Sequence, residues 1–280
     1  VLASGSLRIF EGDIPGRAGS GGSAVYLPVR ARDDAIGVLV LEHEASTPLD
    51  QSELRTVATA AAQLALSAQN LRLVDDLRRS FATSIVAIAT AVEARDGYTE
   101  IHCERLAAFS VALAERLGLS AEELEAVRLG ALLHDVGKIA IPDRVLLKPG
   151  SLTAAERKTM EGHTLIGERI VKAIHGIHDW TLACVRHHHE RWDGGGYPGG
   201  LAGQQIPLPA RIVGVVDVWD ALSAKRPYKE ARQEAMVRET LTKGRGVQFD
   251  PELVDVFLRV LDEEGQELLE LFQGREEPRV

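Results

Sequence analysis

The chain has 280 residues, of which 45% are hydrophobic and 26% charged, enough to bury a core in the manner of an ordinary soluble domain. Its 32 Lys and Arg stand against 41 Asp and Glu, and a net charge of −9 argues against non-specific nucleic-acid binding because such a surface repels phosphate backbones. The two cysteines, Cys103 and Cys184, show no metal-type pairing, and no apolar run approaches the roughly 18 residues of a membrane span. We therefore expect a reduced, cytoplasmic protein without disulfides or a membrane segment.

The N-terminal part predicts a short β-rich segment followed by a long helix. Residues 1–23 are rich in Gly and Ser and are predicted to form a loop. Two β-type runs follow, Ala24–Arg30 and Ile36–Leu41, separated by the polar turn Arg32–Asp34. Asp50 and Glu53 then stand at capping-box spacing and predict the start of a helix.

The long helix carries a coiled-coil seam two heptads long. Its apolar positions recur at steps of four and three: Val57, Ala61, Leu64, Ala68 and Leu71. The seam continues in a shifted phase through Val74, Leu77 and Phe81. Two interpretations stay open: the stripe packs on the preceding strands, or it pairs with a second copy in a parallel dimer that carries a signal.

From Ser84 onward the pattern predicts helices almost throughout. Capping residues mark three helix starts: Ser120 with Glu123, Thr153 with Glu156, and Asp250 with Pro251. The stretch from Asp193 to Pro209, rich in Gly and Pro, is the one long loop. The predicted fold is therefore mainly α, preceded by a small α/β segment.

Histidines and aspartates recur on the apolar faces or ends of these helices: His102, His134 with Asp135, His163, and Asp217, while His187–His189 precede the long loop. His163 is expected to share one helix face with Met160. A lone core histidine is usually only hydrogen-bonded. Asp217 is harder to explain in that way, because an ionised carboxylate buried among valines is costly unless it is paired or binds a metal. Imidazole and carboxylate without thiolate suit Fe, Mn, Zn or Ni, and one aspartate can bridge two ions.

At these residues the chain resembles the HD-GYP family, a subclass of the HD phosphohydrolases. The matching segments are His134-Asp135-Val-Gly-Lys138, His188-His189-Glu190-Arg-Trp-Asp193-Gly-Gly-Gly-Tyr197-Pro198, Asp217-Val-Trp-Asp-Ala-Leu222 and Arg226-Pro227-Tyr228. They occur in the family's order, and the resemblance runs from about Ser84 to about Phe272.

The resemblance implies a site with two divalent metal ions, Fe or Mn in the first place. Its ligands would be His102, His134, Asp135, His163, His188, His189 and Asp217. Asp135 would bridge the ions, and His187 would lie outside the ligand set. Members that hold a third metal carry Glu four residues before the first histidine. Tyr98 occupies that position here, with Glu100 nearby, so we expect two ions.

The activity implied by the resemblance is hydrolysis of cyclic di-GMP to pGpG by a metal-activated hydroxide, with further hydrolysis to GMP left open. Lys138 would contact a phosphoryl or leaving oxygen and can also pair with Asp135. Arg226 and Lys229 would hold phosphate, unless they are ordinary surface charges. Gly196, Tyr197 and Pro198 would form a loop against the substrate, with Tyr197 on a guanine, or serve only the loop's structure; Glu190 and Asp193 would hold that loop.

Two other functions remain: a non-catalytic signalling module that binds a partner or a cyclic dinucleotide, and an HD hydrolase of another cyclic dinucleotide. Residues 1–70 resemble the C-terminal half of a GAF sensory domain, 50–83 form a linker helix, and 84–275 form the HD-GYP domain. We expect a homodimer through the linker helix and signalling partners of the GGDEF type.

Overall fold

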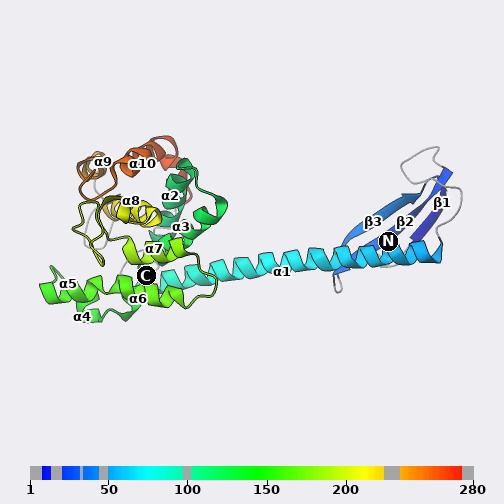
Figure 1. Cartoon of the computed structure of the whole chain (residues 1–280), viewed down its shortest axis with the longest axis horizontal. Coiled ribbons are helices and arrows are strands. Elements are labelled where there is room, and N and C mark those ends of the chain that lie inside the picture. Colours follow the sequence, from blue (N-terminus) through cyan, green and yellow to red (C-terminus); the bar gives the residue numbers. More distant parts are fainter. Residues whose placement is uncertain are drawn as a thin grey trace. The chain divides into compact units, whose positions relative to one another are not determined.

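The computed structural model describes residues 8–13, 21–31, 34–43, 50–96, 102–223 and 234–272 (Figure 1). The chain divides into two compact units, Val1–Ala82 and Thr83–Val280. Four positions singled out in the sequence lie outside the described residues: Tyr98, Glu100, Arg226 and Lys229.

The first unit contains a three-stranded antiparallel sheet. Its strands are β1 (Arg8–Asp13), β2 (Gly21–Ala31) and β3 (Asp34–His43), in the order β1-β2-β3. The prediction of a loop over residues 1–23 is wrong at β1 and at the start of β2. β1 pairs with β2 from Arg8 opposite Tyr26 to Asp13 opposite Gly21. This pairing supplies backbone hydrogen bonds that the local Gly and Ser content does not reveal.

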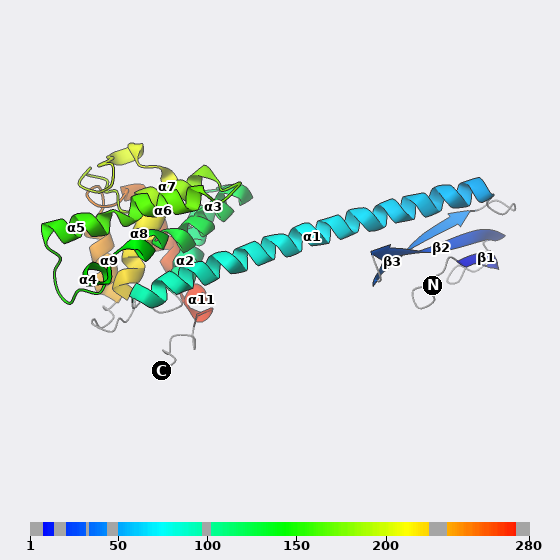
Figure 2. The same ribbon diagram turned by 90° about the horizontal axis from the view of Figure 1, so that it is seen from below.

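Helix α1 (Gln51–Asp96) begins in the first unit and ends in the second. The predicted capping box is present, since Asp50 N donates to Glu53 Oε2 and Glu53 N donates to Asp50 Oδ1, both at 2.8 Å. The strands lie beside the first part of α1 (Figure 2), where Ala61 packs against Val25 and Leu27. The start of the apolar seam therefore packs on the chain's own sheet.

The seam does not stay buried along its whole length. Leu64 and Leu71 are 52% and 73% exposed, and Leu77 is 71% exposed. The helix also passes residue 83 without a break, because no Gly or Pro interrupts it before Asp96.

The second unit is helical. After the last turns of α1, its elements follow in this order: α2 (His102–Arg116), α3 (Ala121–Leu133), η1 (Val136–Ala140, a 3₁₀ helix), α4 (Asp143–Leu146), α5 (Ala154–Glu161), α6 (His163–Lys172), α7 (Asp179–His187), η2 (Gly203–Gln205, a 3₁₀ helix), α8 (Leu208–Ser223), α9 (Glu234–Lys243), α10 (Pro251–Glu263) and α11 (Gly265–Glu270). None of the described helices is both long enough and apolar enough to cross a membrane.

Helix α8 is the central element of this unit, and it packs against α2, α3, α7, α9 and α10. Its apolar residues Ile212, Val213 and Val216 are fully buried. Burial of side chains of this size contributes about 1.5–3 kcal/mol each, which fixes the one element that carries Asp217. The core thereby sets the position of a polar side chain.

Local signals position the surrounding helices. The capping boxes at Ser120 and Thr153 are present, as is the N-cap at Asp250. Two details differ from expectation. Pro209 lies in the first turn of α8 instead of in the loop, because proline fits the start of a helix. The segment expected to place Met160 and His163 on one helix face is divided, with α5 ending at Glu161 and α6 starting at His163.

Candidate metal centre

All seven predicted metal ligands come together from separate elements. They lie at helix ends or inside α8: His102 begins α2, His134 and Asp135 follow α3, His163 begins α6, His188 and His189 follow α7, and Asp217 lies in α8. They form two groups, Asp135 with His163, His188 and His189, and His102 with His134 and Asp217. Within each group, one ligand atom per residue lies within 4.8 Å of the others. We call these the Asp135 group and the Asp217 group.

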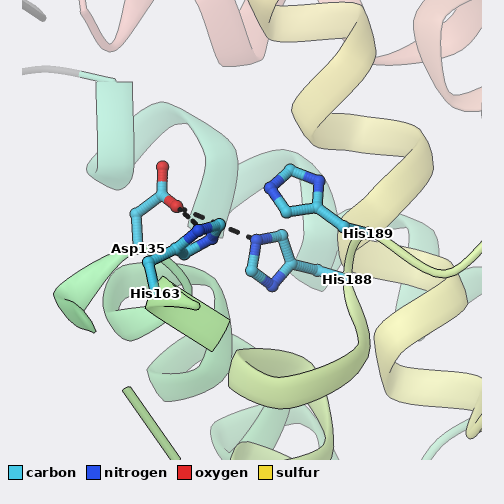
Figure 3. Close-up of side chains that lie close together, drawn as sticks. All are labelled: Asp135, His163, His188 and His189. Atoms are coloured by element: carbon cyan, nitrogen blue, oxygen red, sulfur yellow. Dashed lines mark ion pairs between the residues drawn. The ribbon is translucent and has the colours of Figure 1, made fainter. Parts of the chain in front are cut away.

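In the Asp135 group, imidazoles converge on one carboxylate oxygen (Figure 3). Asp135 Oδ1 lies 3.2 Å from His163 Nε2 and 3.8 Å from His188 Nε2. The ring of His189 lies against that of His188, with centroids 4.0 Å apart. Three imidazoles and a carboxylate thus surround a small volume.

The Asp217 group is arranged around the other carboxylate. Asp217 Oδ1 lies 3.9 Å from His102 Nε2 and 4.0 Å from His134 Nε2. The second oxygen of Asp135, Oδ2, lies 3.2 Å from His134 Nε2. Asp135 therefore presents one oxygen to each group, which is the arrangement that a bridging ligand requires.

A glycine allows η1 to approach the start of α6. A Cβ atom at Gly137 would lie 1.9 Å from the carbonyl oxygen of His163, closer than any side chain tolerates. Only glycine permits this contact, which brings the segment after Asp135 against the helix that begins at His163.

Backbone carbonyls fix the orientation of three imidazoles. The Nδ1 atoms of His134, His163 and His188 lie 2.8, 2.6 and 3.0 Å from the carbonyl oxygens of Ala131, Met160 and Cys184. A carbonyl can only accept, so each Nδ1 carries a proton, and in the neutral form of each imidazole Nε2 keeps its lone pair. All three carbonyls lie in the last turn of a helix, where acceptors are in excess of donors, and the Cys184 carbonyl uses its second lone pair to accept also from His188 N at 3.1 Å.

The atoms that face the centre are left without hydrogen bonds. Nε2 of His134, His163 and His188 and Oδ1 of Asp135 are buried and make no hydrogen bond within the part of the chain that the structure describes. Each such atom costs about 1–3 kcal/mol, and buried polar groups of this kind are rare. Their convergence fits a metal ion as the missing partner.

The electrostatics of the site also fit metal binding. Burial, with the neighbouring imidazoles, lowers the pKa of His188 well below its ordinary value and that of His189 to about 4. Burial acts to raise the pKa of Asp135, but Lys138 and His134 outweigh it and hold that pKa well below its ordinary value. Neutral imidazole and ionised carboxylate are the forms that bind metals.

His134 differs from these two histidines. Burial acts to lower its pKa, but the carboxylates of Asp135 and Asp217 outweigh burial and raise the pKa to about 9. A metal ion that binds Nε2 of His134 must therefore displace a proton, so affinity for the metal should rise with pH.

Lys138 and Tyr197 border the centre. Lys138 Nζ lies 2.7 Å from Asp135 Oδ2, so the expected ion pair is present. The ring of Tyr197 lies 4.8 Å from that of His189, and both Tyr197 and Pro198 are partly buried. A Cβ atom at Gly196 would lie 2.4 Å from Arg191 N, so this glycine packs against backbone, in keeping with the structural interpretation of the loop.

Glu190 and Asp193 hold the long loop, as the sequence predicts. The Glu190 carboxylate accepts from Gly199 N at 2.7 Å and from Leu201 N at 3.1 Å. Asp193 accepts from Gly195 N at 2.9 Å. His187 belongs to neither metal group, and its Nδ1 lies 3.4 Å from Glu190 Oε1.

Asp220 is a site residue to which the sequence analysis assigned no role. It is fully buried, its Oδ2 lies 2.5 Å from His102 Nδ1, and its Oδ1 accepts from Arg105 Nε at 2.5 Å. Burial acts to raise its pKa, but His102 and Arg105 outweigh it and lower that pKa, so Asp220 is ionised. The available signal was its place three residues after Asp217, on the same helix face.

Comparison with known proteins adds a family to this geometry. A family model described as HD domain matches residues 83–253. The cyclic di-GMP phosphodiesterase response regulator RpfG of Xanthomonas campestris is 44% identical over 211 residues, 74% of this chain and 56% of that protein. The 3′3′-cGAMP-specific phosphodiesterase 2 of Vibrio cholerae is 39% identical over 201 residues, 71% of this chain and 38% of that protein.

A solved structure shares the fold. The cyclic GMP-AMP specific phosphodiesterase of V. cholerae aligns with a TM-score of 0.53 at 20% identity, covering 68% of this chain and 50% of that one. The chain spans about half the length of the curated relatives it matches.

Proposed function

We propose that this chain, which belongs to the HD domain family, is a metal-dependent phosphodiesterase of the HD-GYP subclass that hydrolyses cyclic di-GMP to pGpG. One observation carries the proposal. The two groups of His and Asp residues meet at Asp135, and buried ligand atoms that face the centre make no hydrogen bond among the described residues. Relatives named cyclic di-GMP phosphodiesterases, at 44% and 41% identity, support the choice of substrate.

Two divalent ions, Fe or Mn, would be held by the Asp135 group and the Asp217 group, with Asp135 between them. When bound, such ions supply Lewis acidity and a hydroxide nucleophile at neutral pH. The neutral imidazoles of His188 and His189 offer lone pairs without competition from protons. The chain's contribution is to hold these ligands in place and to keep Asp135 ionised.

Other residues would bind the substrate. Lys138, beside Asp135 Oδ2, can donate to a phosphoryl or leaving oxygen without losing its ion pair, because an ammonium has three donors. Tyr197, against His189, can stack on a guanine at the edge of the centre, with Pro198 next to it. Arg226 and Lys229 as phosphate ligands stay predictions, because they lie outside the described residues.

Product analysis tests the proposal. Metal-loaded chain is incubated with cyclic di-GMP and, separately, with 3′3′-cGAMP, and the products are separated by chromatography. We expect pGpG from cyclic di-GMP and a lower kcat/KM for 3′3′-cGAMP, because two relatives named cyclic di-GMP phosphodiesterases are 44% and 41% identical, whereas the 3′3′-cGAMP-specific phosphodiesterase 2 is 39% identical. Faster cleavage of 3′3′-cGAMP would reassign the substrate. Tight binding without any product would support the signalling-module alternative instead.

We also propose that α1 pairs with its counterpart in a parallel homodimer in the cytoplasm, where it would link a partial GAF-type segment and GGDEF-type partners to the site. Support comes from the exposed Leu71 and Leu77 on this helix. Leu71→Glu should yield monomers in sedimentation experiments. The control is Ala62→Glu. Ala62 is also exposed, but it lies nine residues before Leu71 and therefore on the opposite side of the helix, so this variant should keep the parent's oligomeric state. Equal sedimentation of both variants and the parent chain would remove α1 as the dimer element.

A further inference from the structure

We propose that Glu93 and Arg95, on the last turns of α1, are positioning residues that hold the two segments carrying His102 and Asp135 in place around the metal centre. The catalytic consequence rests on the proposed function. The consequence for metal retention does not, because it follows from the contacts of the two side chains alone.

Glu93 holds the start of α2. It is 5% exposed, and its Oε1 accepts from the backbone N of Cys103 at 2.9 Å. The first N–H groups of a helix have no partner inside the helix, so the Glu93 oxygen supplies the acceptor that the N–H of Cys103 needs. Cys103 directly follows His102 in the first turn of α2. The Glu93 contact therefore fixes the backbone from which His102 projects toward Asp217.

Arg95 holds η1 and the residues after it. Its guanidinium donates to the carbonyl oxygens of Lys138, Ile139 and Ile141 at 3.1, 2.6 and 2.8 Å. It also pairs with Asp143, whose Oδ1 lies 2.6 Å from Nη2. Arginine suits this role because five donors in a rigid fork can satisfy several acceptors at once.

The segment held by Arg95 is one that the chemistry needs. η1 begins directly after Asp135 and contains Lys138. Three carbonyls from this short segment point at one side chain, so the guanidinium fixes its curvature. A shift of η1 would move both the proposed bridging carboxylate and the ammonium paired with it.

The two side chains diverge from one helix end. Residues two apart on an α-helix point about 200° apart, so Glu93 and Arg95 reach different neighbours. The end of α1 therefore lies between the segment that starts at His102 and the segment that follows Asp135. Each holds a different metal group: Glu93 acts on the Asp217 group through His102, and Arg95 acts on Asp135, which both groups share.

The test measures how fast the full-length, metal-loaded chain releases metal to a chelator, with no substrate present, and then measures kcat and KM. The variants are Glu93→Ala, Glu93→Gln, Arg95→Ala and Arg95→Lys. Asp76→Ala and Arg72→Ala, exposed on the same helix, are matched controls for the loss of one charge. Thermal unfolding monitors the fold of each variant.

We expect Glu93→Ala to release metal about 10–100-fold faster, the range usual for groups that orient metal ligands. Glu93→Gln should behave like the parent chain, because its amide oxygen still accepts from Cys103 N. Arg95→Ala should lower kcat with little change in KM. The kcat of Arg95→Lys should lie between those of Arg95→Ala and the parent, because an ammonium cannot reach all three carbonyls. The two controls should match the parent.

Equally fast metal release from Glu93→Gln and Glu93→Ala would overturn the proposal, because the charge of Glu93 and not its hydrogen bond to Cys103 would then hold the metal. Unchanged metal release in both alanine variants would overturn it as well. If Glu93→Ala fails to fold, metal release from Glu93→Gln and from the two Arg95 variants still tests the proposal, because the Arg95 side chain is partly exposed and its replacement should be tolerated. Metal release that follows the expected order in a chain inactive on cyclic di-GMP would reject the proposed function but keep the positioning role.

Discussion

The two metal groups are built on different supports. In the Asp135 group, the described contacts that orient His163 and His188 are backbone carbonyls of the helices that precede these residues, α5 and α7. In the Asp217 group, the carbonyl of Ala131 orients His134, but His102 is oriented by the carboxylate of Asp220, which in turn pairs with Arg105. A support made of backbone is less sensitive to a single side-chain substitution than a support made of side chains. The Asp217 group should therefore be the more easily weakened.

The largest expected effect comes from the residue that the two groups share. Asp135→Ala removes one carboxylate oxygen from each, so we expect both metals to be lost together and hydrolysis to fall about a thousandfold or more, as befits several kcal/mol of transition-state stabilisation. Elemental analysis and product chromatography check this, with Asp76→Ala as the control. A variant that kept one metal at full occupancy would show that the groups are independent and that Asp135 does not bridge them.

The next prediction sets one group against the other. Asp220→Asn keeps an oxygen for His102 Nδ1 but removes the charge that pairs with Arg105, so we expect metal affinity to fall about 10–100-fold in the Asp217 group alone. When the metal-free Asp220→Asn chain is titrated with metal, the affinities of its two binding steps should therefore differ more than those of the parent chain. Equal weakening of both steps would contradict the proposed difference in supports.

The seven ligand positions were implied by the resemblance to the HD-GYP family, because each of them stands in or between the family's motifs in the expected order. The sequence analysis did not assign a role to Asp220, because that role depends on His102, which lies 118 residues away in the chain. Roles of this kind follow from packing, which local pattern does not encode.

The elements were predictable to a similar extent. Capping boxes at Asp50, Ser120 and Thr153 marked helix starts correctly because they are made of residues three apart. β1 was missed because the Gly and Ser content of residues 1–23 predicts a loop, although β1 pairs with β2, the next strand in the chain. The roles of Glu93 and Arg95 were missed because they depend on contacts with Cys103 and with residues 138–143, which the local pattern does not place beside α1.

A third prediction concerns substrate rather than metal. Arg226→Ala should raise KM about tenfold, the loss of roughly one charge-assisted contact, while metal content and the two binding steps stay unchanged. Steady-state kinetics with cyclic di-GMP and elemental analysis of the same sample measure this. A loss of metal in Arg226→Ala would place this residue among the supports of the centre instead.

The smallest effect concerns the outer support of the Asp135 group. Helix α5 supplies the carbonyl of Met160 that orients His163, and α5 itself starts at the capping box of Thr153 and Glu156. Thr153→Ala should destabilise the chain by about 0.5–2 kcal/mol and speed metal release from the Asp135 group slightly. Chemical denaturation and chelator competition measure the two quantities.

The capping box of Thr153 and Glu156 also makes the stability of the folded chain depend on pH, in a direction that follows from the pKa of Glu156. The Lys148 ammonium and the hydrogen bonds from Thr153 lower the pKa of Glu156 from 4.5 to about 2. A carboxyl whose pKa is lower in the folded state stabilises that state above its unfolded pKa and loses this contribution as pH falls through the folded value. The stability difference between the parent chain and Glu156→Gln should therefore be constant above about pH 4.5 and shrink toward pH 2. Glu239→Gln removes a similar ion pair with Lys243 on α9, so it should also be less stable than the parent at neutral pH, by a difference that shrinks in acid, but it should leave metal release unchanged. Faster metal release in both variants would mean that ion pairs act on the centre through general stability, and the specific link from α5 to His163 would have to be given up.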